Sequence, residues 1–163
     1  QKINEIKISN KTDWRKKHCL SLDQFYNKSE FYINYKNEVH EIYQTQWDSL
    51  SELNMYFISK MLKWLNIKTP ILRSSQLNIS GQSTELIINI CKELNANHYI
   101  SGFGGKNYLD TNYFIENKIK LDYLENKRIV NYNQQYQEIG FIDDLSALDI
   151  IFNCGDKWDE YLA

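Results

Sequence analysis

The chain has 163 residues, which is the length of one ordinary domain. Hydrophobic residues make up 42% and charged residues 25%, and this balance excludes a disordered or fibrous protein. The net charge of -2 lacks the basic surplus that is typical of nucleic-acid binding proteins. We therefore expect no nucleic-acid partner. No apolar run approaches the roughly 18–20 residues that span a bilayer, so we expect no membrane span.

The cysteines indicate a reducing compartment. Cys19, Cys91 and Cys154 are odd in number and widely spaced, which excludes a disulfide framework and a zinc site of the usual spacing. Thiols left single are typical of proteins outside the secretory route. We predict no metal site and no cofactor.

The first third of the chain is predicted to be mainly helical. Ile3 to Ser9 alternates apolar and polar residues, which predicts a short strand. Apolar residues then recur at steps of three and four, which predicts three helices over residues 12–27, 29–43 and 48–66. Pro70 follows the third helix, and the residue before a proline disfavours helical backbone.

Strands and helices alternate in the rest of the chain. We predict strands at residues 70–75, 98–101 and 119–124, and helices at residues 83–94, 110–115 and 146–152. Ser83 or Thr84 is the predicted N-cap of the first of these helices. Helices that follow strands at these spacings predict an α/β fold with a mostly parallel sheet, which could be an incomplete Rossmann-like arrangement. Residues 1–163 form one predicted domain.

A glycine loop, residues 102–110, follows the strand at residues 98–101. Gly102, Gly104 and Gly105 permit positive φ and close backbone approach, and successive N–H groups there could bind an anion beside Lys106. The spacing matches neither a Walker A loop nor a complete dinucleotide fingerprint. The alternative is a plain strand-to-helix turn, and the sequence leaves both interpretations open.

Two further polar groups stand at predicted element ends. Ser74 and Ser75 close a predicted strand, which indicates either a ligand-binding edge or an exit loop with a helix cap. Near the C-terminus, the spacing of Ser146 and Asp149 suits a helix cap with an acidic residue in the first turn, and catalysis is the alternative. Cys154 stands among apolar residues and has no neighbouring histidine in the sequence, which favours a core role.

Taken in order, pieces spread over nearly the whole chain resemble the WbqC-like family. The order and spacing of the last four are the most specific. The pieces are Trp14-Arg15-Lys16-Lys17, Tyr26, residues 53–65, Ser74-Ser75, residues 85–94, residues 98–102, Asn107-Tyr108-Leu109-Asp110, Tyr132 with Gln135, Leu145-Ser146 with Asp149, and Phe152-Asn153-Cys154-Gly155.

The resemblance implies a bacterial, cytoplasmic enzyme of O-antigen or other surface-polysaccharide biosynthesis, including lipopolysaccharide. Members of this family usually begin with a motif like M-Q-P-x-F-x-P-x-x-G-Y, followed by a strand with an Asp-Asp pair and an Asn-Arg pair. This chain lacks both. We therefore expect it to be the C-terminal portion of a longer protein, with part of the active site outside it.

The leading hypothesis is a transferase that acts on a nucleotide-activated sugar or a related acyl or amino donor. In this hypothesis the substrate is a small molecule, a nucleotide-sugar or an amino sugar, and Asp110 is the general base. The rival hypothesis is a non-catalytic binding or scaffold module, supported by the richness in Tyr and Trp. The sequence leaves the oligomeric state open. The predicted substrate-binding residues are Gly102, Gly104, Gly105 and Lys106 for the phosphate, Ser74 and Ser75 at the same sheet edge, and Tyr108 and Gln135 beside the sugar or acceptor.

Overall fold

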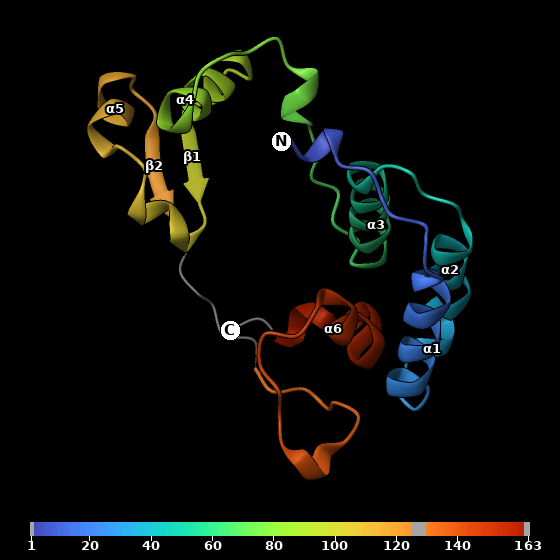
Figure 1. Ribbon diagram of the computed structural model, residues 1–163. Helices are drawn as coiled ribbons and strands as arrows, with labels where there is room; N and C mark the ends of the chain where they lie inside the picture. Colours follow the sequence, from blue (N-terminus) through green and yellow to red (C-terminus); the bar gives the residue numbers. More distant parts are fainter. Residues whose placement is uncertain (1, 125–129, 162–163) are drawn as a thin grey trace. The chain divides into compact units, whose positions relative to one another are not determined.

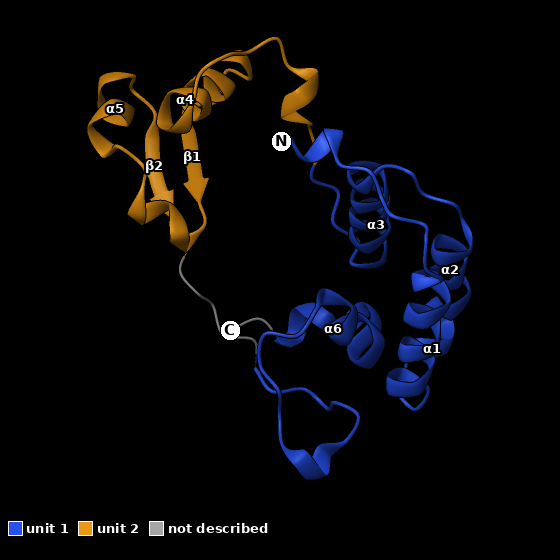
Figure 2. Cartoon of the chain, viewed as in Figure 1, with its two compact units in different colours: residues 1–69, 128–163 blue, residues 70–127 orange. Residues whose placement is uncertain are grey.

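The computed structural model describes residues 2–124 and 130–161. The chain divides into two compact units (Figure 2). Unit 1 contains Gln1–Thr69 and Arg128–Ala163, and unit 2 contains Pro70–Lys127. Each unit is described by itself below, and the expectation of a single domain stays a prediction.

The described residues of unit 1 include four α-helices. They are α1 (Trp14–Tyr26), α2 (Tyr32–Gln44), α3 (Leu50–Trp64) and α6 (Ala147–Cys154), and all four were predicted (Figure 1). Side chains cap three of them, as Ser and Asp commonly do. Asp13 accepts from the N–H of Lys16 at the start of α1, Ser49 caps α3, and Ser146 caps α6. The caps fix where these helices begin.

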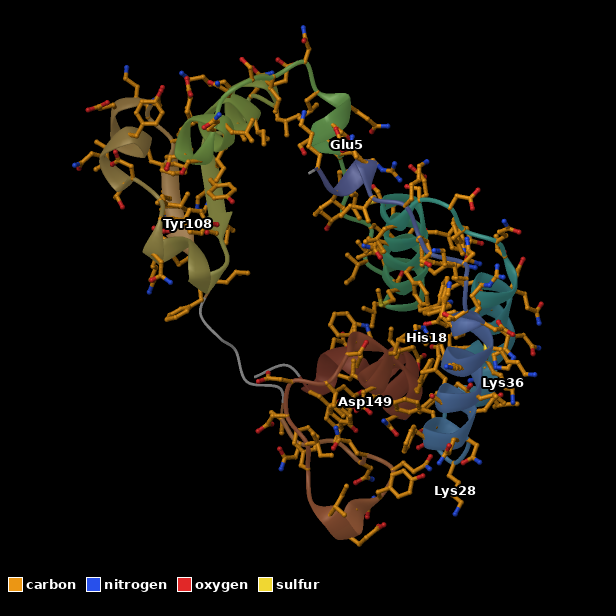
Figure 3. The ribbon with its side chains drawn as sticks, in the orientation of Figure 1. Glu5, His18, Lys28, Lys36, Tyr108 and Asp149 are labelled. Atoms are coloured by element: carbon orange, nitrogen blue, oxygen red, sulfur yellow. The ribbon has the colours of Figure 1, made fainter. Side chains whose placement is uncertain are left out.

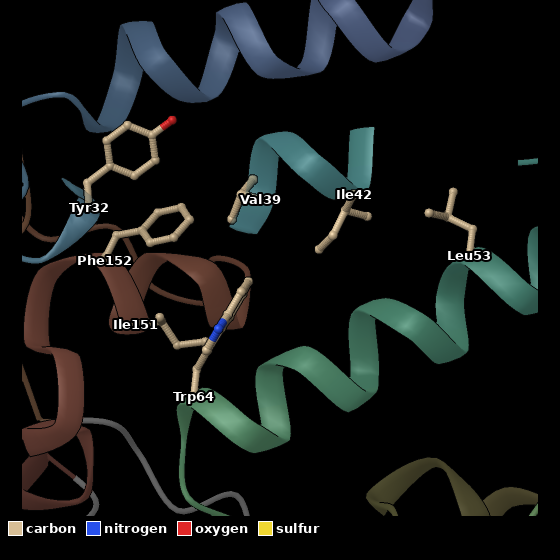
Figure 4. Packing of buried hydrophobic residues seen from close by; sticks show 7 residues of the cluster. All are labelled: Tyr32, Val39, Ile42, Leu53, Trp64, Ile151 and Phe152. Carbon is tan, nitrogen blue, oxygen red and sulfur yellow. The ribbon is translucent and has the colours of Figure 1, made fainter. Parts of the chain in front are cut away.

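The core of unit 1 forms where α6 packs against α2 and α3. The ring of Phe152 lies 4.9 Å from that of Tyr32 and 5.1 Å from that of Tyr26, centroid to centroid. Edge-on aromatic pairs of this kind add to the stabilisation that burial provides. Figure 4 shows the buried cluster, which contains Tyr32, Val39, Ile42, Leu53, Trp64, Ile151 and Phe152.

The N-terminal segment is not a strand, so the prediction for residues 3–9 is wrong. Ile3–Glu5 is a short 3₁₀ helix, and Lys7 then forms a single antiparallel bridge to Ser49. Backbone hydrogen bonds from Ile8 to Asp48 and from Leu50 to Ile6 complete this contact. The alternating pattern indicates an extended segment, but this segment pairs with the residues before α3 through a single bridge instead of a strand ladder.

Unit 2 contains the sheet. Its elements are α4 (Ser83–Glu93), β1 (His98–Ser101), α5 (Thr111–Glu116) and β2 (Lys120–Tyr123), all of them predicted. β1 and β2 pair in parallel, with His98 opposite Lys120 and Ser101 opposite Tyr123. The chain therefore has the α/β fold with a parallel sheet that the sequence predicts. A larger, Rossmann-like sheet stays a prediction.

A second hydrophobic cluster holds unit 2 together. Phe114 of α5 is fully buried and stacks on Tyr99 of β1 at 5.7 Å between ring centroids. Ile88 and Cys91 of α4 and Ile119 complete the buried cluster with Leu109. One face of each strand and one side of each helix are thereby covered.

Two local predictions for unit 2 are wrong. Residues 70–75 form no strand: Ile71 and Leu72 are exposed, and Ser74–Gln76 is a 3₁₀ helix. Neither Ser83 nor Thr84 caps α4, because the N-cap is Gln82. The buried hydroxyl of Thr84 instead accepts a hydrogen bond from the backbone N–H of Asp110. It therefore joins α4 to the start of α5.

Three more 3₁₀ helices complete the described elements, namely η3 (Phe103–Asn107), η4 (Gln137–Ile139) and η5 (Gly155–Tyr161). Within residues 2–124 and 130–161, no helix has the length and apolar character needed to traverse a bilayer. Nor do these residues bring together three His, Cys, Asp or Glu side chains in a way that could hold a metal ion.

Candidate functional site

The strongest candidate site is a cavity of about 400 Å³ in unit 1, which we call the Asp149 cavity. This volume is within the range of about 300–1,000 Å³ that is typical of small-molecule sites. Its walls come from the end of α1, the irregular segment before α6 and the first turns of α6. The lining residues are Phe25, Tyr26, Gln134, Gln135, Tyr136, Ile139, Ile142, Leu145 and Asp149.

Asp149 supplies a buried carboxylate to the cavity. It lies in the first turn of α6, and only 3% of its surface is exposed. Its backbone N–H donates to the carbonyl of Ser146, and its own carbonyl accepts from the amide of Asn153 at 2.8 Å. These local bonds fix the backbone of Asp149 on α6, where Figure 3 labels it.

Two side chains donate hydrogen bonds to one oxygen of this carboxylate. The hydroxyl of Tyr132 lies 2.7 Å from Asp149 Oδ2, and the amide nitrogen of Gln134 lies 2.9 Å from the same atom. Tyr26 of α1 also lies near Asp149, whose charge contributes to raising the pKa of the Tyr26 phenol. A buried charge is stable only when such donors replace water. The arrangement keeps a carboxylate inside an otherwise apolar hollow.

The carboxylate and the burial around it raise the pKa values of its neighbours. Burial is the larger cause at both Tyr26 and Tyr132, and the hydrogen bond and charge of Asp149 add to it. Both phenols therefore stay neutral donors at physiological pH. Burial, together with the charges of Asp149 and Glu30, raises the pKa of Cys154 to about 11. Its buried thiol is neutral and agrees with the predicted core role.

Gln134 closes the irregular wall of the cavity. Its amide oxygen accepts from the N–H of Ile142 at 2.8 Å, and its amide nitrogen donates to the carbonyl of the same residue at 3.0 Å. These two hydrogen bonds hold the backbone of Ile142 against Gln134 and so order the loop that leads to α6. The exposed residues Ile139 and Leu145 are held on the same wall.

Tyr136 has unusual backbone geometry at the rim. Its φ of 69° and ψ of 45° are left-handed, which is uncommon for a bulky residue and occurs often at functional sites. Its ring lies 6.5 Å from that of Phe25, and its hydroxyl donates to the carbonyl of Gln24. The neighbouring Gln135 accepts from the N–H of Lys28 at 3.0 Å. The end of α1 and this segment are thereby joined across the cavity mouth.

The glycine loop of unit 2 follows β1, as predicted. However, its glycines do not use positive φ: Gly102 has a φ of -62°, and the residues after it form η3. Gly105 is needed for close approach, because a Cβ there would overlap Ser101 Oγ. Gly102 and Gly104 face open space. A nest of alternating backbone conformations is therefore absent from this loop, and its anion-binding role stays a prediction.

Lys106 is exposed, and its ammonium lies over two aromatic rings. Its Nζ is 5.0 Å from the ring centroid of Phe103 and 5.3 Å from that of Tyr123. Such exposed contacts contribute about 0.5–1 kcal/mol. The charge is available to a ligand at the carboxyl end of β1, where Tyr108 is also exposed. This is the position that the sequence predicted for a phosphate.

The carboxylate of Asp110 has a structural partner. Its Oδ1 accepts from the N–H groups of Asn112 and Tyr113 at 3.0 and 3.3 Å, so it caps α5. A proton acceptor in catalysis would have to leave this cap or share it. The role of Asp110 as general base stays a prediction.

The predicted site residues fall into both units. Gly102, Gly104, Gly105, Lys106, Tyr108 and Asp110 lie in one stretch of unit 2. Ser74 and Ser75 belong to the same unit but sit in a 3₁₀ helix instead of at a strand end. Gln135 belongs to unit 1 and lines the Asp149 cavity.

Sequence reasoning missed most of this cavity. Asp149 was interpreted mainly as a capping residue, whereas its carboxylate bonds to Tyr132 and Gln134. Gln134, Ile139 and Ile142 were not singled out, because they lie in an irregular stretch without periodicity. The available signal was the sequence proximity of Tyr132, Gln135 and Asp149.

A second hollow, of about 330 Å³, lies between α1 and α2. It is more polar, and its charged residues include Arg15 and Lys16. The His40 ring beside it pairs with Asp23 at 3.2 Å, and a guanidinium nitrogen of Arg15 donates to the carbonyl of Thr45. These side chains therefore have structural partners, and we regard the Asp149 cavity as the better candidate.

Comparison with known proteins gives the family. The model of the WbqC-like protein family matches residues 1–160. A similar protein is the "Uncharacterized protein Rv1507c" of Mycobacterium tuberculosis, which is 29% identical over 163 residues, covering 99% of this chain and 69% of the relative. No solved structure matches the chain. With nearly its whole length covered by the family model, the chain belongs to the WbqC-like protein family.

Proposed function

We propose that the protein is a transferase-type enzyme of bacterial surface-polysaccharide biosynthesis, such as the biosynthesis of the O-antigen. Its donor is a nucleotide-activated sugar or a related acyl or amino donor, and it acts in the cytoplasm. The single observation that carries the proposal is the Asp149 cavity, a hollow of sugar-binding size with aromatic walls and one buried carboxylate. The implied role of the family supports it.

The chemistry of the lining suits a sugar. Aromatic and aliphatic side chains such as Phe25 and Ile139 cover the apolar C–H face of a pyranose ring, while Asp149 and Gln135 offer hydrogen-bond acceptors and donors to its hydroxyl groups. In this proposal Asp149 orients the sugar. Separately, within unit 2, the glycine loop with Lys106 binds a phosphate, Asp110 is the general base, and Ser74, Ser75 and Tyr108 contribute to that phosphate site.

The test is a thermal-shift screen with nucleotides, nucleotide-sugars and free sugars. A ligand that binds only the folded state stabilises it by about 2.7 kcal/mol at a hundredfold excess over its Kd. We expect nucleotide-sugars to raise the Tm of the parent. Ile139→Ala, at 66% exposure in the cavity wall, should reduce the shift, and the matched control Ile33→Ala, at 73% exposure on α2, should not.

The phosphate role has its own variant. Lys106→Ala removes an exposed ammonium without opening the core, so the fold should be retained. We expect it to weaken the response to nucleotide-sugars and leave the response to free sugars unchanged. Equal responses of Lys106→Ala and the parent to nucleotide-sugars would contradict this role.

A non-catalytic binding module is the second candidate. The observation that favours it is that both carboxylates considered for chemistry have structural partners, Asp110 at the start of α5 and Asp149 beside Tyr132. This candidate predicts binding without turnover. A parent that does not respond to nucleotides or nucleotide-sugars would favour it over the transferase.

A further inference from the structure

We propose that the Asp149 cavity selects a sugar that carries a primary amine, and that it rejects phosphate and other anions. The inference rests on the proposed function and deepens it. It assigns the amine-bearing sugar to unit 1 and places the phosphate of the donor outside this cavity. The evidence is the charge of the lining and of the segment that builds it.

Asp149 is the only residue with a formal charge among the described residues that line the cavity. The others are aromatic, aliphatic or carboxamide side chains. Only 3% of Asp149 is exposed, and its carboxylate oxygen Oδ2 accepts hydrogen bonds from the neutral side chains of Tyr132 and Gln134. An anionic ligand would bring a second negative charge into the same apolar hollow.

The wall segment carries no positive charge that would offset Asp149. Residues 130–149 contain four acidic residues and no Lys, Arg or His. Besides Asp149, they are Glu138 in η4 and the adjacent pair Asp143 and Asp144 before α6. Glu138, Asp143 and Asp144 are exposed and lie outside the lining, so solvent screens their charges.

The opposite wall of the cavity, at the end of α1, does not offset the negative charge of Asp149. The end of α1 contributes Phe25 and Tyr26, and the nearest basic residue along the chain is Lys28. The backbone N–H of Lys28 binds Gln135, but its side chain is exposed and is not part of the lining (Figure 3). Its charge is therefore screened by solvent.

An ammonium group suits both the carboxylate and the aromatic rings of the cavity. It can donate charge-assisted hydrogen bonds to a carboxylate, and these are roughly twice as strong as neutral ones. It is also attracted to the faces of aromatic rings such as Phe25 and Tyr136 at the mouth. A neutral sugar gains only the weaker hydrogen bonds, and a sugar phosphate gains a repulsion.

The test is a ligand-observed NMR titration of the full chain with glucosamine, glucose and glucose 6-phosphate. At about pH 6 the amine is protonated, because this pH is below the pKa of about 7.7–8.0 that is typical of an α-amino group. We expect glucosamine to bind about tenfold more tightly than glucose, with glucose 6-phosphate the weakest of the three.

Two exposed-site variants separate charge from shape. Ile139→Lys places an ammonium on the cavity wall, and Ile33→Lys places one on α2 outside it. Because both positions are mostly exposed, both variants should fold. We expect Ile139→Lys to weaken glucosamine at least threefold more than glucose, and Ile33→Lys to change neither.

Several results would overturn the inference. Equal affinities for glucosamine and glucose would do so, as would tighter binding of glucose 6-phosphate, or an Ile139→Lys effect that is the same for all three sugars. Absence of glucosamine binding at roughly 50 mM, well above the about 1 mM scale of weak binding, would also overturn it. The proposed function fails separately, when nucleotide-sugars give no thermal shift.

Discussion

Replacing Gly155 by alanine should test the packing that holds α6, and with it Asp149, in unit 1. Gly155 ends α6 with a φ of 60° and a ψ of -128°, a conformation that costs a side chain roughly 1–3 kcal/mol. An added Cβ would lie 2.6 Å from Cδ1 of Phe31, whereas ordinary contacts are 3.4–4 Å. Overpacking of this kind costs about 1–3 kcal/mol more. We expect Gly155→Ala to lower the free energy of unfolding by roughly 2–6 kcal/mol in urea denaturation.

The controls divide this loss into its two causes. Gly140 has a φ of 84°, but an added Cβ would meet no atom within 4 Å, so Gly140→Ala should show the backbone cost alone. In a Phe31→Ala background, where the ring is missing, Gly155→Ala should cost no more than Gly140→Ala. If Gly155→Ala is already as mild as Gly140→Ala in the parent, Phe31 does not pack on Gly155 and the reasoning is refuted.

Three more predictions concern stability and reactivity. Gly105→Ala should destabilise unit 2 by about 1–3 kcal/mol, because its Cβ would overlap Ser101. Gly104→Ala should change the stability by less than about 0.5 kcal/mol, because its Cβ would meet no atom within 4 Å. Urea denaturation of the two variants compares these effects. Asp149→Asn should lower the unfolding free energy by about 1–3 kcal/mol, because a neutral amide oxygen accepts the two hydrogen bonds from Tyr132 and Gln134 less strongly than a carboxylate does. A loss near zero would contradict the hydrogen bonds described. Cys154 has its folded pKa raised from 9.0 to about 11, so its contribution to stability is present below pH 9 and is lost as the pH rises toward 11. Urea denaturation between pH 8 and about pH 11 should therefore show a steeper fall for the parent than for Cys154→Ala.

Most elements could be predicted from the sequence because their apolar residues recur with a clear period. The helices of unit 1 and the parallel strands β1 and β2 are confirmed. Residues 3–9 and 70–75 show the limit of the method, because alternation or a short apolar run predicts an extended chain but not whether a partner strand lies beside it. Ile71 and Leu72 are exposed apolar residues, and a strand pattern cannot distinguish them from buried ones.

The candidate site was harder to predict than the fold. Its residues come from α1, from an irregular segment and from α6, and they meet because Gln134 pairs with the backbone of Ile142 and Tyr136 adopts left-handed backbone. No periodicity predicts either feature. The glycine loop, in contrast, was visible in the sequence, but three glycines did not reveal that only Gly105 is in close contact.

The most direct test of the central claim is to locate a bound nucleotide-sugar by NMR on the chain labelled with ¹³C at its isoleucine methyl groups. Ile139 and Ile142 line the Asp149 cavity, whereas Ile33 on α2 and Ile58 on α3 are exposed elsewhere in unit 1. The account predicts that titration shifts the methyl signals of Ile139 and Ile142 and leaves those of Ile33 and Ile58 in place. Binding that leaves Ile139 and Ile142 unchanged would show that the sugar does not enter this cavity, and would contradict the account.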